Sequence, residues 1–473
     1  MSSSRHLSTV TTVPRPLDHV FAFFSMPENL GRITPPELAF ELTSTDTRMR
    51  KGLRIDYKIR PILGLPARWQ TLITGYEQPH RFVDIQLRGP YRQWEHEHTF
   101  TPLGGATQVQ DDVTYQLPLG RLGDLFHDRL VRTALERIWG YRAWAIRQIF
   151  APIESNPDPM RVGVAGGTGF VGGAITAELH RRGHRALALS RGGEAARGPL
   201  PDEVQIRTAD VRDPSTLVEP MQGLDALVIA LAFPNLPMES PRLGHTFMEV
   251  DAAGTERLVA AAAAAGVRHV IYISGAGASP EAREVWFRAK ARAEAAVRAS
   301  GMTFTIIRPT WIYGPRDVAL NRFLGFARAL PLVPMTNAGR QLLAPVFIGD
   351  VAALVADALT DPAAADQTFE LGGPETLPMR DIIRRALRVA GLGRPLLPGP
   401  TPLIKAGAVP LSLLPTPPLT PDAVDFINAP ATVDVVPLLE RMPRRLTPLD
   451  EGLGSYLAPG ANGDIRFGEA GTS

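Results

Sequence analysis

The chain has 473 residues, more than a single hydrophobic core usually serves, so we expect two or three domains. A formal net charge of +2 gives no electrostatic footprint for nucleic acid, and we expect no nucleic-acid partner. Cysteine is absent, which excludes disulfides, thiolate metal sites and a cysteine nucleophile, and a cytoplasmic location fits this composition best.

The chain shows no sign of a membrane-spanning or targeting segment. The stretch from Met1 to Val13 lacks the long apolar core of a signal peptide. No apolar run reaches the roughly 18 uninterrupted residues that a transmembrane helix requires. We therefore expect no transmembrane segment, and membrane contact that is at most peripheral.

Residues 1–150 have the pattern of a first domain. Apolar and charged residues alternate from Leu53 to Arg60, which predicts a half-buried strand. A helical pattern with apolar residues three and four apart closes the domain, from Leu122 to Ile149. We expect an α+β fold in which a curved antiparallel sheet wraps around one long helix. Further strands are expected at residues 69–76, 82–87, 93–100 and 107–115.

One predicted strand carries two histidines that could hold a metal. His96 and His98 are two residues apart, so both imidazoles could face the same side of the sheet. A third ligand is not evident, and Trp94, His96, His98 and Phe100 more simply form the buried face of one strand. We therefore expect no metal site in this chain.

Several stretches of the first domain form a recognisable set: residues 20–24 with 27–30, residues 94–100, and Gly104-Gly105 leading to residues 113–115. In these stretches residues 6 to 150 resemble the SRPBCC group of polyketide cyclases and dehydrases, which have a START-like helix-grip fold. This resemblance implies an apolar cavity between sheet and helix, and hence a small apolar molecule as the ligand of the N-terminal domain.

Residues 151–160 contain three prolines and no apolar periodicity, which is typical of a linker. After them, short apolar runs alternate with helical patterns, which indicates βαβ units and an α/β Rossmann domain with a doubly wound parallel sheet over residues 161–395. Residues 396–473 are first proline-rich and then weakly helical, and we expect a cap and tail with a frayed end. The expected parallel strands are residues 161–165, 185–190, 204–208, 226–230, 269–274 and 303–308.

A glycine-rich turn at residues 162–172 follows the first of these strands and opens a helix. Gly166 permits the tight turn, Gly169 lets the backbone approach a diphosphate, and Gly172 lets the helix pack close to the strand. This context predicts a dinucleotide site. Within the turn, the residues expected at the cofactor are Gly166, Thr168, Gly169, Phe170, Val171 and Gly172.

The second strand indicates which dinucleotide is bound. An NAD-selective site offers Asp or Glu to the adenosine ribose about 20 residues after the glycines, but here the strand ends in Ser190-Arg191. Because an arginine suits a 2′-phosphate, we favour NADP and keep NAD as the alternative. Asp210-Val211, after the third strand, are expected near the adenine, although an Asp there is also an ordinary turn former.

This domain resembles the atypical short-chain dehydrogenase/reductases, especially the group that includes the nucleotide-binding accessory subunit of respiratory complex I. The resemblance rests on the glycine turn together with residues 269–277, 289–294, 307–314 and 345–351. It implies that the segment after Pro309 contacts the nicotinamide, whereas Asp350 is explained as a helix N-terminal cap. Beyond the glycine turn, the residues expected at the cofactor are Ser190, Arg191, Asp210, Val211, Leu231, Ala232, Ser274, Lys290, Pro309 and Thr310.

In the active members of that family a Ser, a Tyr and a Lys act together on the substrate carbonyl. Ser274 and Lys290 match the Ser and the Lys, but Trp286 stands where the family's Tyr belongs, four residues before Lys290. An indole N–H does not exchange its proton near neutral pH, so ordinary chemistry of this family is in doubt. Trp286 is equally explained as a packing residue, and the spacing favours neither Tyr272 nor Tyr313 as another proton donor.

Two functions therefore stay open. The first is an NADP(H)-dependent oxidoreductase that acts on a lipophilic carbonyl or quinone-like molecule, bound through the N-terminal domain. The second is a non-catalytic nucleotide-binding protein, a sensor or accessory subunit, with an apolar guest in the N-terminal domain. Ser274 and Lys290 favour the first function, and Trp286 favours the second.

Overall fold

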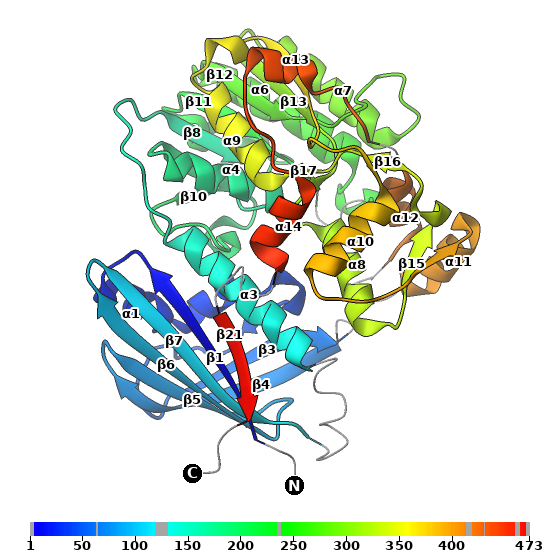
Figure 1. The fold of residues 1–473 in the computed structure, drawn as a ribbon. Coiled ribbons are helices and arrows are strands. Elements are labelled where there is room, and N and C mark those ends of the chain that lie inside the picture. Colours follow the sequence, from blue (N-terminus) through cyan, green and yellow to red (C-terminus); the bar gives the residue numbers. More distant parts are fainter. Residues whose placement is uncertain are drawn as a thin grey trace.

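Two large sheets organise the chain in the computed structural model (Figure 1). The structure describes residues 4–62, 65–118, 131–233, 238–412, 419–429, 431–458 and 464–469. An eight-stranded sheet belongs to the N-terminal domain, and a seven-stranded sheet belongs to the domain that follows the linker. Among the described residues, no helix is both long and apolar enough to cross a bilayer.

The N-terminal sheet is antiparallel, as expected, and α1 (Leu17–Phe24) and α3 (Arg132–Ile149) pack their apolar faces against it. The alternation on its central strand is confirmed, because Trp94, His96, His98 and Phe100 are all buried. The first part of the predicted long helix, residues 122–130, lies outside the described residues. The sheet order is β2 (Glu41–Leu42), β3 (Arg54–Ile62), β4 (Leu65–Glu77), β5 (Arg81–Arg88), β6 (Gln93–Leu103), β7 (Ala106–Gln116), β1 (Arg5–Val13) and β21 (Asp464–Glu469).

The last strand, β21, comes from the opposite end of the chain. It pairs antiparallel with β1, so that Thr9 faces Ile465 and Leu7 faces Phe467. The guanidinium of Arg132 lies 4.9 Å from the ring centre of Phe467. Our expectation of a frayed end is therefore wrong for residues 464–469, because this strand covers β1, which would otherwise be an exposed sheet edge.

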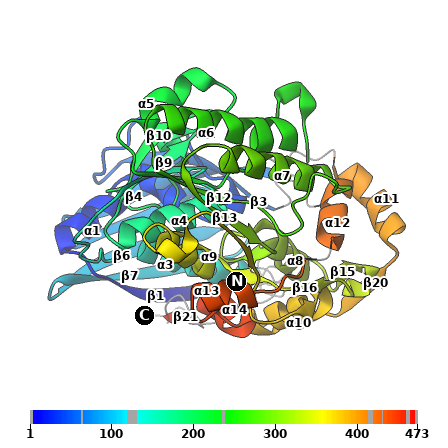
Figure 2. The same cartoon turned by 90° about the horizontal axis from the view of Figure 1, so that it is seen from above.

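The second sheet is parallel throughout, which confirms the Rossmann prediction. Its order reverses between β8 and β11, and ligands of such sheets bind beside that point, at the carboxyl ends of the strands. Helices α4 (Phe170–Arg181) and α9 (Ile348–Ala358) cover one face, and α6 (Gly254–Ala264) and α7 (Val285–Arg298) cover the other (Figure 2). The strands are β10 (Gln205–Thr208), β9 (Arg185–Ser190), β8 (Arg161–Ala165), β11 (Ala226–Ile229), β12 (His269–Ile273), β13 (Thr303–Pro309) and β18 (Gln367–Leu371).

Most of the remaining elements form a cap beside the carboxyl ends of the parallel strands (Figure 1), whereas α5 (Val218–Met221) and α13 (Val436–Arg441) pack on the faces of the sheet. Asp350 lies in the first turn of α9 rather than at its N-cap, which is Phe347, so our N-cap explanation is wrong. The Asp350 carboxylate instead accepts hydrogen bonds from the backbone N and the hydroxyl of Thr447, which fastens the C-terminal segment. The other elements outside the two large sheets and their covering helices are β14 (Ile312–Tyr313), α8 (Val318–Ala329), β15 (Val333–Thr336), β16 (Leu342–Leu343), β17 (Val346–Phe347), β19 (Leu377–Pro378), α10 (Met379–Val389), β20 (Leu396–Gly399), α11 (Thr401–Leu411), α12 (Pro421–Asn428) and α14 (Leu449–Leu457).

Candidate nucleotide and substrate site

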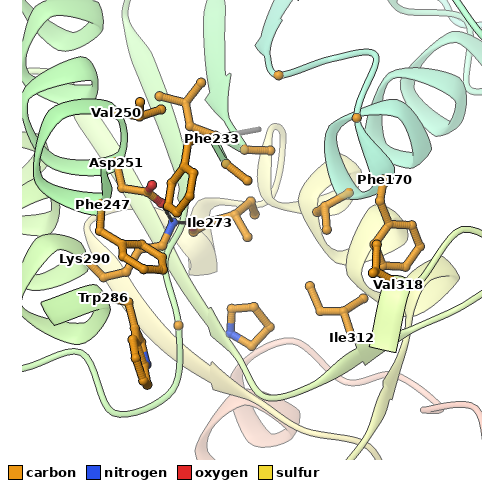
Figure 3. A pocket seen from close by; sticks show the side chains of 18 of the residues that line it. Phe170, Phe233, Phe247, Val250, Asp251, Ile273, Trp286, Lys290, Ile312 and Val318 are labelled. Atoms are coloured by element: carbon orange, nitrogen blue, oxygen red, sulfur yellow. Dashed lines mark hydrogen bonds and ion pairs between the residues drawn. The ribbon is translucent and has the colours of Figure 1, made fainter. Parts of the chain in front are cut away.

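A single cavity of about 980 Å³ lies at the carboxyl ends of the parallel strands. It runs from the glycine turn, past the ends of β9 and β11, to Lys290 on α7 and to residues of α12. Figure 3 shows Lys290 and Asp251 facing each other on one side, with Phe247 and Trp286 beside them and Phe170 across the space. A long ligand therefore reaches both ends of one continuous space.

The glycine turn is shaped so that no side chain fills the approach to α4. Gly166 has a φ of +77°, and a Cβ there would lie 2.4 Å from the carbonyl oxygen of Ala230. A Cβ on Gly172 would lie 2.2 Å from the carbonyl oxygen of Gly166. The helix begins at Phe170 with no side-chain cap, so its first amides are available to an anion. This geometry fits the diphosphate of a dinucleotide.

Arg316 supports the glycine turn, a role that was not predicted from the sequence. Its guanidinium donates to the carbonyl oxygens of Gly169 and Thr168, at 3.1 and 3.2 Å. Burial lowers the pKa of Arg316. Because both bonds go to backbone oxygens, Arg316 fixes the shape of the turn and leaves its amides free for a ligand.

A basic corner lies where the adenosine end of a dinucleotide would sit. The hydroxyls of Thr168 and Ser190 are 2.9 Å apart, and Arg191 Nη1 lies 3.2 Å from His245 Nε2. Next to them, Arg212 forms an ion pair with Asp210 at 2.8 Å. The hydrogen bond from Arg212 lowers the pKa of Asp210, so Arg212 balances the negative charge of the Asp210 carboxylate. The corner therefore keeps Arg191 as a cation without a carboxylate partner among the described residues.

Lys290 is held at the other end of the cavity by a buried acid. Its Nζ lies 2.9 Å from Asp251 Oδ1 and 5.3 Å from the ring centre of Tyr272. Burial alone would lower the pKa of Lys290, but its interactions with Asp251 and Tyr272 together outweigh burial and raise it. Asp251 lies in a π-helical stretch, Phe247–Ala253, and such stretches recur at functional sites. Lys290 therefore enters the cavity as a fixed cation.

Ser274 lines the cavity, but its hydroxyl proton is already used. The hydroxyl donates to Glu294 Oε1, and Arg308 donates to both oxygens of that carboxylate. Burial alone would raise the pKa of Glu294, but the hydrogen bonds from Arg308 and Ser274 lower it. A hydroxyl has one proton to donate, so Ser274 in this arrangement can accept a hydrogen bond from a ligand but cannot give one.

Aromatic side chains surround the Lys290 end of the cavity. Trp286 packs against Phe247 and Phe426, with ring centres 5.9 and 5.5 Å apart, so it both packs and lines the cavity. Among the described residues that line this cavity there is no tyrosine. Tyr272 is buried behind Lys290, and burial raises its pKa to about 12. The arrangement offers a flat apolar molecule a stacking surface and one cation.

Most of the residues predicted from the sequence for the cofactor site lie at this cavity. Every residue expected at the cofactor lines the cavity except Gly172, which lies beneath Gly166. Asp251 and Phe426 were missed: no spacing pattern relates Asp251 to Lys290, and Phe426 comes from a segment explained only as a cap. The other lining residues that sequence reasoning did not name include Gly192, Arg212, Phe233, Phe247, Val250, Phe287, Trp311 and Arg322.

Both halves of the chain match families of known proteins. A family model described as NAD(P)H-binding matches residues 166–328. A second, described as polyketide cyclase / dehydrase and lipid transport, matches residues 13–138. Both predicted resemblances are thereby confirmed.

Several curated proteins match about half of the chain or slightly more. The mitochondrial NADH dehydrogenase (ubiquinone) 1 alpha subcomplex subunit 9 of Arabidopsis thaliana is 29% identical, over 58% of this chain and 70% of that protein. The NAD(P)H azoreductase of Xenophilus azovorans is 27% identical, over 49% of this chain and 74% of that protein. The (4-alkanoyl-5-oxo-2,5-dihydrofuran-3-yl)methyl phosphate reductase of Streptomyces griseus is 31% identical, over 49% and 74%.

A solved structure shows the same fold. The UDP-glucose 4-epimerase of Thermotoga maritima superposes with a TM-score of 0.51 at 16% identity, over 63% of this chain and 97% of that one. At this identity the likeness concerns the fold and not the reaction.

Proposed function

We propose that this chain, which belongs to the family of NAD(P)H-binding, short-chain dehydrogenase/reductase-like proteins, is an NADP(H)-dependent reductase of an apolar, conjugated acceptor such as a quinone or a lipophilic carbonyl. The observation that carries this proposal is the single cavity that joins the glycine turn to Lys290 and the aromatic side chains around it. One end suits a diphosphate and the other a flat apolar molecule.

The preference for NADP over NAD rests on the basic corner. Arg191 stands where an NAD-selective site would offer a carboxylate, and the nearby Asp210 is already paired with Arg212. A 2′-phosphate would gain a charge-assisted hydrogen bond from Arg191.

The residues at the Lys290 end limit which acceptors are suitable. When bound, the cofactor supplies a hydride, which is two electrons with one proton. Lys290, kept cationic by Asp251, stabilises the negative charge that develops on the acceptor oxygen. Since no tyrosine lines the described cavity, we infer that a proton from water completes the reduction. This favours acceptors whose reduced anion is stabilised by conjugation, and it disfavours simple ketones.

For the N-terminal domain we propose an apolar ligand. The support is its match to a family described as polyketide cyclase / dehydrase and lipid transport. Its core is rich in aromatic side chains, among them Phe21, Phe82 and Phe100, whose ring centres lie 5.2 to 6.2 Å apart. Such a domain would hold an apolar acceptor close to the reductase domain of the same chain.

A second candidate function is a non-catalytic nucleotide-binding subunit or sensor. Two observations favour it: Trp286 replaces the acid of the active family members, and the Ser274 proton is committed to Glu294. In that case the cavity would still bind NADPH, because the glycine turn and the basic corner are independent of those two positions.

The two functions are separated by measuring NADPH oxidation by the full chain with a panel of quinones and carbonyl compounds. Reductase function predicts turnover of at least one conjugated acceptor, lowered about 100-fold in Lys290→Met. Lys58→Met is the control, since Lys58 pairs with Glu41 on the exposed edge of the other domain. NADPH binding, seen as a raised melting temperature, without oxidation of any acceptor above the Lys290→Met rate would support the second function.

A further inference from the structure

Four polar side chains lie together on the buried face of the N-terminal sheet. Asp84 on β5 is directly opposite His96 on β6, and Asp111 on β7 is directly opposite His98. The side chains of His96, His98 and Asp111 are 5 to 7% exposed, and that of Asp84 is 15% exposed. Our expectation that the two histidines lack a third ligand is therefore wrong, because sheet register brings Asp84 to them.

Asp84 and the two imidazoles point ligand atoms at one another. Asp84 Oδ2 lies 3.4 Å from His98 Nε2 and 3.7 Å from His96 Nδ1, and the three ligand atoms lie within 4.8 Å of one another. Two ligands that each lie about 2.1 Å from a tetrahedral ion are about 3.4 Å apart. The spacing is thus close to that of a coordination sphere.

Asp111 contacts the opposite sides of both rings. Its Oδ1 lies 3.0 Å from His96 Nε2 and 2.7 Å from His98 Nδ1. The contact with His96 Nε2 is a hydrogen bond, which keeps the proton on that nitrogen and leaves the lone pair of His96 Nδ1 directed toward Asp84. Histidine ligands of metals almost always have such a partner on the far nitrogen. The contact with His98 Nδ1 is close but does not have the geometry of a hydrogen bond.

The cluster contains two carboxylates and one nearby guanidinium. Arg142 Nη2 lies 4.0 Å from Asp111 Oδ1. Among the described residues, no arginine or lysine lies within ion-pair distance of Asp84, whose neighbours within that distance are the two histidines. In the same core, Trp139 Nε1 and Arg142 Nε are buried donors that have no acceptor among the described residues.

We propose that Asp84, His96 and His98 bind a divalent first-row transition ion, with Asp111 orienting the imidazole of His96. Two nitrogen ligands and one oxygen ligand suit Zn²⁺ or Fe²⁺, whereas Mg²⁺ and Ca²⁺ prefer all-oxygen sites. Three protein ligands leave a coordination position for water or for a carbonyl oxygen of an apolar guest. This proposal concerns the N-terminal domain and is independent of the reductase function proposed for the other.

The test uses the purified full chain, stripped with a chelator and then reloaded with Zn²⁺ or Co²⁺. We expect one equivalent of metal after desalting and visible absorption bands with Co²⁺, which here cannot arise from thiolates because the chain has no cysteine. Loading should also raise the melting temperature by several degrees. His98→Gln, and separately Asp84→Asn, should lose the equivalent, the bands and the thermal shift.

His80→Gln is the matched control, because His80 is exposed on the turn just before β5. Each variant is first checked by circular dichroism and by NADPH binding of the other domain, so that loss of metal is separable from loss of fold. The nearly isosteric Asp84→Asn covers the case in which His98→Gln does not fold. Absence of metal and cobalt bands from the wild type would overturn the proposal. Metal content that is equal in all variants would also overturn it, because the metal would then be bound by other residues.

Discussion

The hydroxyl of Ser274 donates to Oε1 of Glu294 at 2.5 Å, and the two side chains are 6% and 1% exposed. Arg308 and Arg298 hold the same carboxylate from the other side. Because Glu294 is charged and buried, breaking its bond to Ser274 would leave part of a carboxylate unsatisfied. The serine that the family uses to orient a carbonyl therefore contributes here to the stability of α7 and β13.

We predict that Ser274→Ala changes kcat/KM for the best acceptor by less than about threefold and lowers the free energy of unfolding by about 1 to 3 kcal/mol. Lys290→Met, by contrast, should lower kcat/KM about 100-fold. Steady-state NADPH oxidation and urea unfolding measure the two effects. A loss in Ser274→Ala as large as that in Lys290→Met would mean that the serine hydroxyl turns toward the substrate.

A second prediction concerns the missing tyrosine. Trp286 lies one helical turn before Lys290 and lines the cavity, so Trp286→Tyr would place a phenol near a fixed ammonium, which lowers the phenol pKa. We expect at least a tenfold gain in the reduction of simple carbonyl compounds, and no gain in Trp286→Phe, which removes the indole without adding an acid. NADPH oxidation by both variants measures this. Equal rates for the two would show that a proton donor at this position is not what limits the reaction.

Six of the seven strands of the parallel sheet could be predicted to within about one residue, and the reason is local. The central strands are buried on both faces and therefore appear as short apolar runs between turn residues, as in residues 161–165 and 185–190. The edge strand β18 was missed, because its sequence alternates polar and apolar residues and is only partly buried. Strands β1 and β21 were also missed. Their pairing joins residues about as far apart as the chain allows, and neither strand carries a distinctive pattern of its own.

The candidate site likewise has a part that could be predicted from a local motif and a part that could not. The glycine turn is a local motif with a mechanical reason for each glycine, so its place could be predicted. Asp251 and Lys290 meet only because a π-helical stretch lies beside α7, and Asp84 meets His96 only through the register of β5 and β6. Partners chosen by tertiary packing leave no spacing signal in one sequence, which is why both acids were overlooked.

Nucleotide selectivity provides a third prediction. Arg191→Ala should raise the Kd for NADPH about tenfold, which corresponds to about 1.4 kcal/mol, and should change the Kd for NADH less than about twofold. Arg207→Ala is the control: Arg207 follows on β10, is paired with Glu219, and does not line the cavity. Fluorescence titrations with the two nucleotides give both constants. Parallel changes for NADH and NADPH would mean that Arg191 does not recognise the 2′-phosphate.

A fourth prediction concerns pH. Asp317, 5% exposed, caps α8 and accepts from the backbone N of Ala319 and Leu320, and burial raises its pKa to about 6. The folded protein therefore binds a proton more tightly than the unfolded chain does. Its stabilising contribution is complete below the unfolded pKa of about 3.9 and is lost as the pH rises through about 6.

Asp317→Asn removes this titration and keeps a capping oxygen. Relative to the wild type, the variant should gain roughly 2 to 3 kcal/mol between about pH 4 and pH 7. Denaturant unfolding at several pH values measures the difference. Parallel curves for Asp317→Asn and the wild type would contradict the assigned shift.

The last prediction concerns the binding site of the diphosphate. It compares substitutions at two neighbouring glycines. A Cβ on Gly172 would lie 2.2 Å from the carbonyl oxygen of Gly166, in backbone that cannot move without opening the turn. On Gly173 the nearest atom would be Arg316 Nη1 at 3.3 Å, the end of a flexible side chain. Gly172→Ala should therefore abolish the thermal shift caused by NADPH. Gly173→Ala should retain this thermal shift. Because Ala is a better helix former than Gly, the unfolding free energy of the Gly173→Ala variant should change by less than about 1 kcal/mol. If Gly172→Ala bound NADPH as tightly as the wild type, the nucleotide would have to lie elsewhere in the cavity.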